Sequence, residues 1–207
     1  IKQKDVDARV KKILRFKYAL GLDTKPQIDL ANIVADINAP ESKVLQRKMV
    51  ASAVTVVKSA NDILPLKNLN NRKIAVVVMG NENGVKSMFA RRCTDYAEAT
   101  VFDYNRVGSL DALQQKIAKG GFNTVIVCVA TPAEAYMNAA KQLASAGGDV
   151  IVATMCHPEK LDLVGSLMGS DKVKASLVTY GTTMTDEDYL AQTIFGGNGA
   201  KGVLPVD

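Results

Sequence analysis

The sequence predicts an α/β fold in which a mostly parallel sheet carries helices on both faces, a three-layer α/β/α sandwich, after a helical linker segment. The first observation is a set of short apolar runs rich in β-branched residues, at 73–79, 123–130, 149–155 and 174–180. Such runs are typical of strands buried on both faces, as in parallel sheets. The second observation is that segments with helical spacing lie between these runs. This alternation predicts parallel strands joined by right-handed crossovers.

The composition limits the class of protein. The chain has 207 residues, of which 47% are hydrophobic and 23% charged, so it can bury a sizeable core and is unlike a disordered chain. The net charge is +5, but the basic residues are scattered except in Arg9–Lys17, where they alternate with apolar residues as on the solvated side of a helix. We therefore expect no nucleic-acid partner. No stretch approaches the length that spans a membrane, so we expect no membrane-spanning segment.

Three cysteines, Cys93, Cys128 and Cys156, lack the spacing of metal ligands. Two of them lie in or beside predicted strands, so we expect buried thiols and no disulfide framework. The chain starts at Ile1, without Met or a targeting peptide, and we expect it to be a piece of a longer protein.

The first part of the chain has a helical pattern. Apolar residues recur at helical spacing within 4–20, and Gly21 follows as a stop signal. A short helix is expected within 28–37, and a longer one from Pro40 to about Ser59. We expect the first helix to fold back onto the helix at 41–59 and to bury Val10, Ile13 and Leu14.

The strand–helix alternation begins only at Lys73, so we place a domain boundary at residue 66. The predicted domains are a helical linker and packing segment, 1–66, and an α/β sandwich, 67–207. A final short strand at 203–206 is expected at a sheet edge, because Pro205 cannot donate to a ladder. The remaining expected elements are strands at 73–79, 99–104, 123–130, 149–155 and 174–180, and helices near 84–93, 109–119, 132–146, 158–168 and 185–195.

The loop after the first strand, Gly80–Gly84, stands where a dinucleotide-binding protein has Gly-x-Gly-x-x-Gly. The acid that such a site needs at the end of the second strand is present as Asp103. The second and third glycines are replaced by Glu82 and Val85, and a carboxylate there would repel a pyrophosphate. We therefore favour a simple turn with permissive glycines, and we expect no cofactor, neither NAD nor NADP.

Glu134 is the one candidate catalytic residue. It lies in the loop after the strand at 123–130, and a strand order of 2-1-3-4-5 would put this loop and Gly80–Gly84 beside the point where ligands usually bind. Its carboxylate could serve as a general acid. The competing interpretation is a capping box, with Thr131 as N-cap, Pro132 at the first helical position and Glu134 three residues past the cap.

Two further patterns have structural interpretations. His157, the only histidine, follows Cys156, but a Cys–His pair acts in catalysis only where the fold positions its partners. Thr185–Asp188 has the pattern of an N-cap followed by an acidic first turn, and three acids in one helical turn are a weaker indication of a metal site. We therefore expect no metal site and no catalytic residue beyond the candidate Glu134.

Several segments together resemble the C-terminal half of glycoside hydrolase family 3. Arg9–Leu22 is similar to the helix that leaves the catalytic barrel of that family. Ala51–Leu66 resembles a helix ending in Val-Lys, followed by Leu-Pro-Leu, and Lys73–Met79 resembles the first strand of the C-terminal sandwich. Ile194–Gly197 and Lys201–Val206 are similar to its Leu-Phe-Gly and Gly-x-Leu-Pro-Val pieces. The likeness is greatest to the β-N-acetylhexosaminidase subgroup.

This resemblance implies a parent enzyme that is a retaining glycosidase acting on β-linked N-acetylglucosamine in carbohydrate metabolism. The family nucleophile is an Asp on the barrel, and the subgroup's proton donor is an Asp–His pair on a barrel loop. Neither motif occurs here, since the barrel is absent. In the β-glucosidase subgroup the acid comes from a loop after a strand resembling 123–130, for which Glu134 is the nearest match.

Two interpretations follow from the sequence. The first is a C-terminal accessory domain whose partners are the catalytic barrel of the same parent chain and its carbohydrate substrate, and which is inactive alone. The alternative is a stand-alone sugar- or nucleotide-binding α/β module. The helix at 5–20 and the segment Ile63–Leu66 favour the first interpretation, because a linker needs them and a stand-alone nucleotide domain does not. The resemblance gives a slight preference for an exported, periplasmic or cell-envelope parent.

Overall fold

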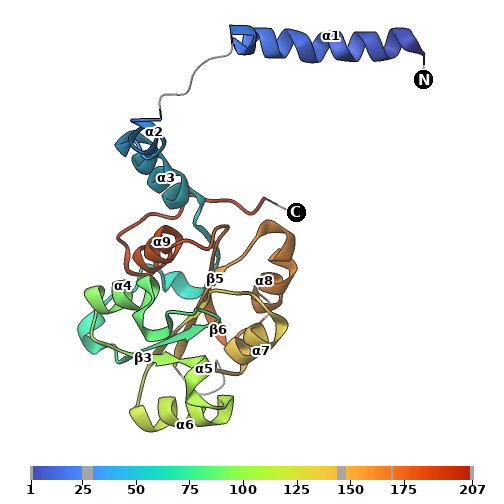
Figure 1. Ribbon diagram of the computed structural model, residues 1–207. Coiled ribbons are helices and arrows are strands. Elements are labelled where there is room, and N and C mark those ends of the chain that lie inside the picture. Colours follow the sequence, from blue (N-terminus) through green and yellow to red (C-terminus); the bar gives the residue numbers. More distant parts are fainter. Residues whose placement is uncertain (1, 25–29, 144–147, 169, 206–207) are drawn as a thin grey trace. The chain divides into compact units, whose positions relative to one another are not determined.

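The structure is a computed structural model that describes residues 2–24, 30–143, 148–168 and 170–205 (Figure 1). The chain divides into two compact units, Ile1–Val44 and Leu45–Asp207. Within the described residues, no helix is both long enough and apolar enough to traverse a bilayer.

The first unit is helical, and most of its described large apolar side chains are exposed. Helix α1 spans Gln3–Ala19, and none of its residues is buried. Val10, Ile13 and Leu14 are 48%, 57% and 57% exposed. The predicted burial of these three residues is therefore not observed. The other helices here are η1 (Leu22–Thr24), α2 (Ile33–Ile37) and α3 (Pro40–Ala53), the last of which continues into the second unit.

The second unit contains a six-stranded sheet in the order β1-β6-β5-β4-β2-β3. Strand β1 is antiparallel to β6, and the other neighbouring pairs are parallel. Five strands match the predicted runs, and their spatial order is the predicted 2-1-3-4-5. The strands are β1 (Thr55–Ser59), β2 (Ile74–Met79), β3 (Ala99–Asp103), β4 (Thr124–Val129), β5 (Asp149–Met155) and β6 (Val173–Thr179).

Strand β1 corrects the predicted helix at 41–59, which ends six residues earlier, at Ala53. The residues that follow, Val54-Thr-Val-Val57, are β-branched and lose side-chain freedom in a helix but suit a pleated strand. They pair with the free edge of β6, where Thr55 lies opposite Val178. The predicted strand at 203–206 is also wrong for its described residues, 203–205, which have no strand structure.

Helices cover both faces of the sheet, as predicted (Figure 1). One face packs against α4 (Met88–Tyr96) and α9 (Met184–Phe195). The other packs against α6 (Leu110–Gly120), α7 (Glu134–Leu143) and α8 (Leu161–Met168). The short elements are α5 (Tyr104–Val107), η2 (Ala60–Asp62), η3 (Leu69–Asn71), η4 (Gly84–Lys86) and η5 (Pro158–Lys160).

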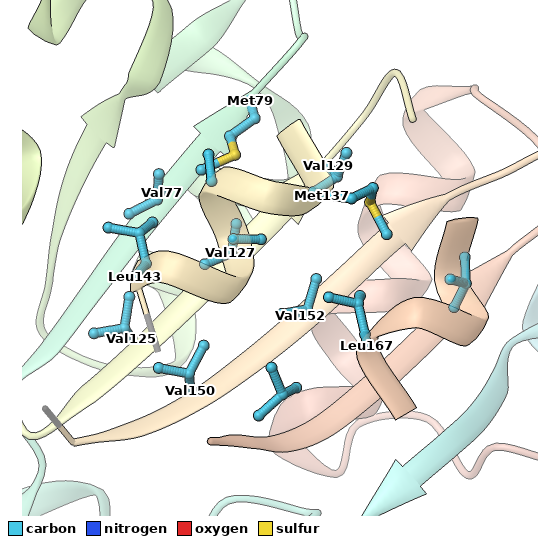
Figure 2. Close-up of a cluster of buried hydrophobic side chains, with 14 of the residues drawn as sticks. Val77, Met79, Val125, Val127, Val129, Met137, Leu143, Val150, Val152 and Leu167 are labelled. Atoms are coloured by element: carbon cyan, nitrogen blue, oxygen red, sulfur yellow. The ribbon is translucent and has the colours of Figure 1, made fainter. Parts of the chain in front are cut away.

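Strand β4 lies in the middle of this core. Its residues alternate between the faces, so Val125 and Val127 contribute to one cluster and Ile126 to the other. Figure 2 shows Met137 and Leu143 of α7 beside the first set. Val125 and Val127 are completely buried, as predicted. All three cysteines are likewise buried and free.

Candidate functional site

The carboxyl edge of the sheet brings two predicted site loops into contact. The loops follow β2 and β4, the adjacent strands from which the chain runs outward in opposite directions, and ligands of open α/β sheets usually bind at this point. The Thr131 hydroxyl donates a hydrogen bond to the Gly80 carbonyl oxygen at 2.9 Å. A Cβ on Gly80, whose φ is +67°, would lie 3.0 Å from both Thr131 and Tyr136. Glycine is therefore needed for the close approach of these loops.

The structure places Glu134 at the surface beside this contact, as the first residue of α7. The predicted capping box is wrong, because α7 begins three residues after Thr131 and the Thr131 hydroxyl is bonded to Gly80 instead. Glu134 accepts no hydrogen bond from the other described residues. Its carboxylate is stabilised by the helix dipole and stays available to solvent. It remains the candidate acid of this edge.

The buried carboxylate of Glu187 fixes the loop after β2. The Asn81 side chain donates to Glu187 Oε1 at 2.8 Å and accepts from the Asn83 backbone N–H at 2.9 Å. Glu187 Oε2 accepts from the Phe89 backbone N–H at the start of α4, also at 2.8 Å. Glu82, between the two asparagines, is exposed. The loop is thus fixed by α9, with Glu82 at its outer side.

Asp103 is the residue that would bind the ribose in a dinucleotide site, but its carboxylate already has hydrogen-bond and ion-pair partners within the domain. It is buried, accepts from the Asn105 backbone N–H at 3.0 Å and pairs with Arg106 at 3.2 Å. Its carboxylate also lies so close to Gly84 that a Cβ there would collide with it. These contacts support the expectation that NAD and NADP do not bind, which stays a prediction.

The acidic turn at the start of α9 is buried and paired. The N-cap is Thr183, which forms a capping box with Asp186, so our assignment of Thr185 is two residues late. Asp188 pairs with Arg92 Nε at 2.5 Å, and Glu187 holds the loop and helix described above. Among the described residues, no group of three potential ligands is placed to hold a metal. Each acid has a structural partner.

The electrostatics of Asp188 follow from its surroundings. Its burial favours the protonated form, but the hydrogen bonds from Arg92 and Gln192, together with the charge of Arg92, outweigh this effect and lower the pKa of the Asp188 carboxyl. The same pairing raises the pKa of Arg92. The pair is therefore ionised at neutral pH.

The adjacent Cys156 and His157 do not form a nucleophile–base pair. The buried Cys156 Sγ donates to the His157 carbonyl oxygen at 3.3 Å, and burial raises the pKa of this thiol. The His157 ring is 70% exposed, and its Nδ1 lies 4.0 Å from Glu159 Oε1. A reactive thiolate needs the opposite shift in pKa.

Three of the segments that carry the family resemblance, at 51–66, 194–197 and 201–206, pack against one another. The Leu66 backbone N–H donates to the Ile194 carbonyl oxygen at 2.8 Å, joining the Leu-Pro-Leu segment to the end of α9. Gly196 lies against Pro65, where a Cβ would come within 3.0 Å of the proline Cβ. The Gly202 backbone N–H donates to the Val54 carbonyl oxygen at 3.1 Å. These motifs therefore stabilise the fold, a role that their separate positions in the sequence did not reveal.

Comparison with known sequences gives a partial match. No family model matches the chain. A proposed beta-xylosidase of Formosa agariphila is 32% identical over 87 residues, which are 42% of this chain and 12% of that protein.

Solved structures resemble the chain over most of its length. A glycoside hydrolase family 3 β-N-acetylglucosaminidase from Paenibacillus sp. matches all of this chain and 40% of its own, with a TM-score of 0.63 and 15% identity. A fungal multi-domain family 3 β-N-acetylglucosaminidase matches 88% of this chain and 20% of its own, with a TM-score of 0.65 and 20% identity. The β-glucoside phosphorylase BglX matches all of this chain and 39% of its own, with a TM-score of 0.66 and 16% identity. The chain thus spans less than half of these proteins. The expected resemblance to a family 3 domain is confirmed at the level of the fold.

Proposed function

We propose that this chain is the C-terminal accessory α/β domain of a retaining family 3 glycosidase, with the catalytic barrel of the same parent chain as its partner. The three solved structures align with 88% to 100% of this chain, whereas this chain covers only 20% to 40% of their length. That proportion suits one domain of a larger enzyme. The accessory domain would supply a surface for the barrel and one wall of the sugar site.

The observation that carries the proposal is the distribution of exposed apolar side chains. Among the described residues, fourteen of the eighteen large exposed hydrophobic residues lie between Val6 and Met49, and four lie in the rest of the chain. Soluble proteins rarely expose so many large apolar side chains in one stretch of the chain unless another surface covers them. The segment therefore has the properties of a linker that packs against a further domain.

The carboxyl edge gives this domain a limited chemical role. Hydrolysis with retention needs two carboxyl groups on either side of the glycosidic bond, about 5–5.5 Å apart. The loop after β4 offers one, Glu134, and the nucleophile would come from the barrel. Two of the similar structures are β-N-acetylglucosaminidases, and this favours an N-acetylhexosaminide substrate for the parent.

The test is an assay of the purified chain with an aryl β-N-acetylglucosaminide. We expect no turnover above the uncatalysed rate, because the nucleophile is absent. The control is the Glu134→Gln variant, which should behave as the parent does. Turnover by the parent chain that disappears in this variant would contradict the proposal and place a complete catalytic site within the chain.

A further inference from the structure

A polar pocket of about 310 Å³ lies at the opposite, amino edge of the parallel strands. It is formed by the segment between β1 and β2 and by the first residues of β5 and β6, to which Asp149 and Lys174 belong. None of the residues of the carboxyl edge discussed above lines it. An inference about this pocket is therefore independent of the proposed function.

The backbone around the pocket is unusual. In the part of the chain that the structure describes, three residues other than glycine have left-handed backbones: Asn61, Asp62 and Asn68, with φ of 52°, 49° and 54°. All three line this one pocket. Such conformations are uncommon, persist where surrounding structure enforces them and gather at ligand sites.

Arg72 forms the fixed wall of the pocket. Its Nε donates to the Lys67 carbonyl oxygen at 3.0 Å, and its Nη1 donates to Thr124 Oγ1 at 2.8 Å and to Asp149 Oδ2 at 3.1 Å. The side chain is 20% exposed. Nη2 has no hydrogen-bond partner among the described residues. The guanidinium is thus held in place with donors left for a ligand.

Two ammonium groups add to this wall. Lys67 Nζ makes no hydrogen bond or ion pair within the described residues, and Lys174 Nζ makes one long bond, to the Asp171 carbonyl oxygen at 3.4 Å. Arg72 and Asp149 neutralise each other as an ion pair. The other charged lining residues are Lys67, Lys174 and Asp62, so the lining has an excess of one positive charge.

We propose that this pocket binds a phosphate group. Guanidinium and ammonium donors that come from separate elements suit a group whose several oxygens accept hydrogen bonds in different directions, and Arg favours phosphate through its fixed fork of donors. The group could be free orthophosphate or the phosphate of a sugar ester. Both have the same chemistry at the pocket, so the experiment compares them.

The experiment is isothermal titration calorimetry of the whole chain in a phosphate-free buffer of low ionic strength. The probes are orthophosphate, glucose 6-phosphate and glucose. We expect saturable one-site binding of at least one of the two phosphate-bearing probes and none of glucose. The tighter of the two phosphate-bearing probes identifies the source. The Lys67→Ala/Lys174→Ala double variant should weaken the binding at least about tenfold.

The matched control is the Lys86→Ala/Lys160→Ala double variant, which removes the same charge from the carboxyl edge. It should bind as the parent does. All four lysines lie outside the buried core, so both double variants should fold, and their amide NMR spectra would show this. The proposal is overturned if no probe saturates, if glucose binds as tightly as its phosphate, or if the two double variants lose affinity equally.

Discussion

Individual polar residues of this chain act mainly as structural contacts. Glu187 holds the loop after β2 and the start of α4, and Asp103 caps α5. Sequence patterns indicate acidic residues at helix starts, but the residue that forms each cap depends on neighbouring loops. Thr131 illustrates this, because the approach of Gly80 takes its hydroxyl away from the expected cap. The position of Glu134 after a central strand made it predictable as a candidate acid. In our proposal the second carboxyl group of the site belongs to the barrel.

The first prediction at this scale concerns Asp188. Asp188→Asn should destabilise the fold by about 1.5–3 kcal/mol at pH 7, since it weakens a buried charge-assisted hydrogen bond to Arg92. The folded-state pKa of Asp188 is lowered, so its contribution is present above the ordinary Asp pKa of about 3.9 and is lost as pH falls through the lower folded value. Urea unfolding at pH 7 and pH 3 should show parent and variant converging at the lower pH.

Asp95→Asn is the matched control for this prediction. Asp95 also pairs with Arg92, at 3.2 Å, but its side chain is 50% exposed against 9% for Asp188. An exposed pair contributes about 0–1 kcal/mol. Equal losses in the two variants, or a difference at pH 7 that persists unchanged at pH 3, would show that the Asp188 pair is not a buried ion pair.

At the scale of elements, the strands were predictable where both faces are covered. The runs that became β2, β4, β5 and β6 are mostly apolar, because helices pack on each side of the sheet. Strand β1 was missed because it directly follows α3 and its valines extend the helical spacing. Its assignment depends on pairing with β6, a contact more than a hundred residues away that local spacing does not contain.

The second prediction concerns the central strand. Val127→Asp should destabilise the fold by about 3–5 kcal/mol, as expected for an unpaired charge at a completely buried position. Thr100→Asp, at an exposed position of the edge strand β3, should change stability by less than about 1 kcal/mol. Thermal unfolding of both variants measures the difference. A Val127→Asp variant that melts within a few degrees of the parent would contradict the central position of β4.

At the scale of the whole molecule, the two compact units differ in how far their apolar side chains are buried. The unit from Leu45 contains the two clusters on the faces of the sheet, whereas α1 has no buried residue. Amphipathic spacing predicted the helix correctly, but it did not show what covers the apolar stripe. In our proposal the catalytic barrel covers that stripe.

The third prediction follows from this difference. Deletion of residues 1–24 should leave the melting temperature of the chain within about 2 °C, because no side chain of α1 is buried. The deletion variant should also self-associate less, since a row of exposed apolar side chains is removed. Calorimetry and analytical ultracentrifugation measure these two outcomes. A large loss of stability would show that α1 packs on the domain after all.

The central claim is that this chain is the accessory domain of a family 3 glycosidase, and the most direct measurement is the sequence of the gene upstream of the Ile1 codon. The account predicts an open reading frame in phase with Ile1. That frame should encode an eight-stranded α/β barrel with an Asp after its seventh strand and an Asp–His pair in one of its loops. A stop codon directly before this chain, or an unrelated domain in that position, would contradict the account.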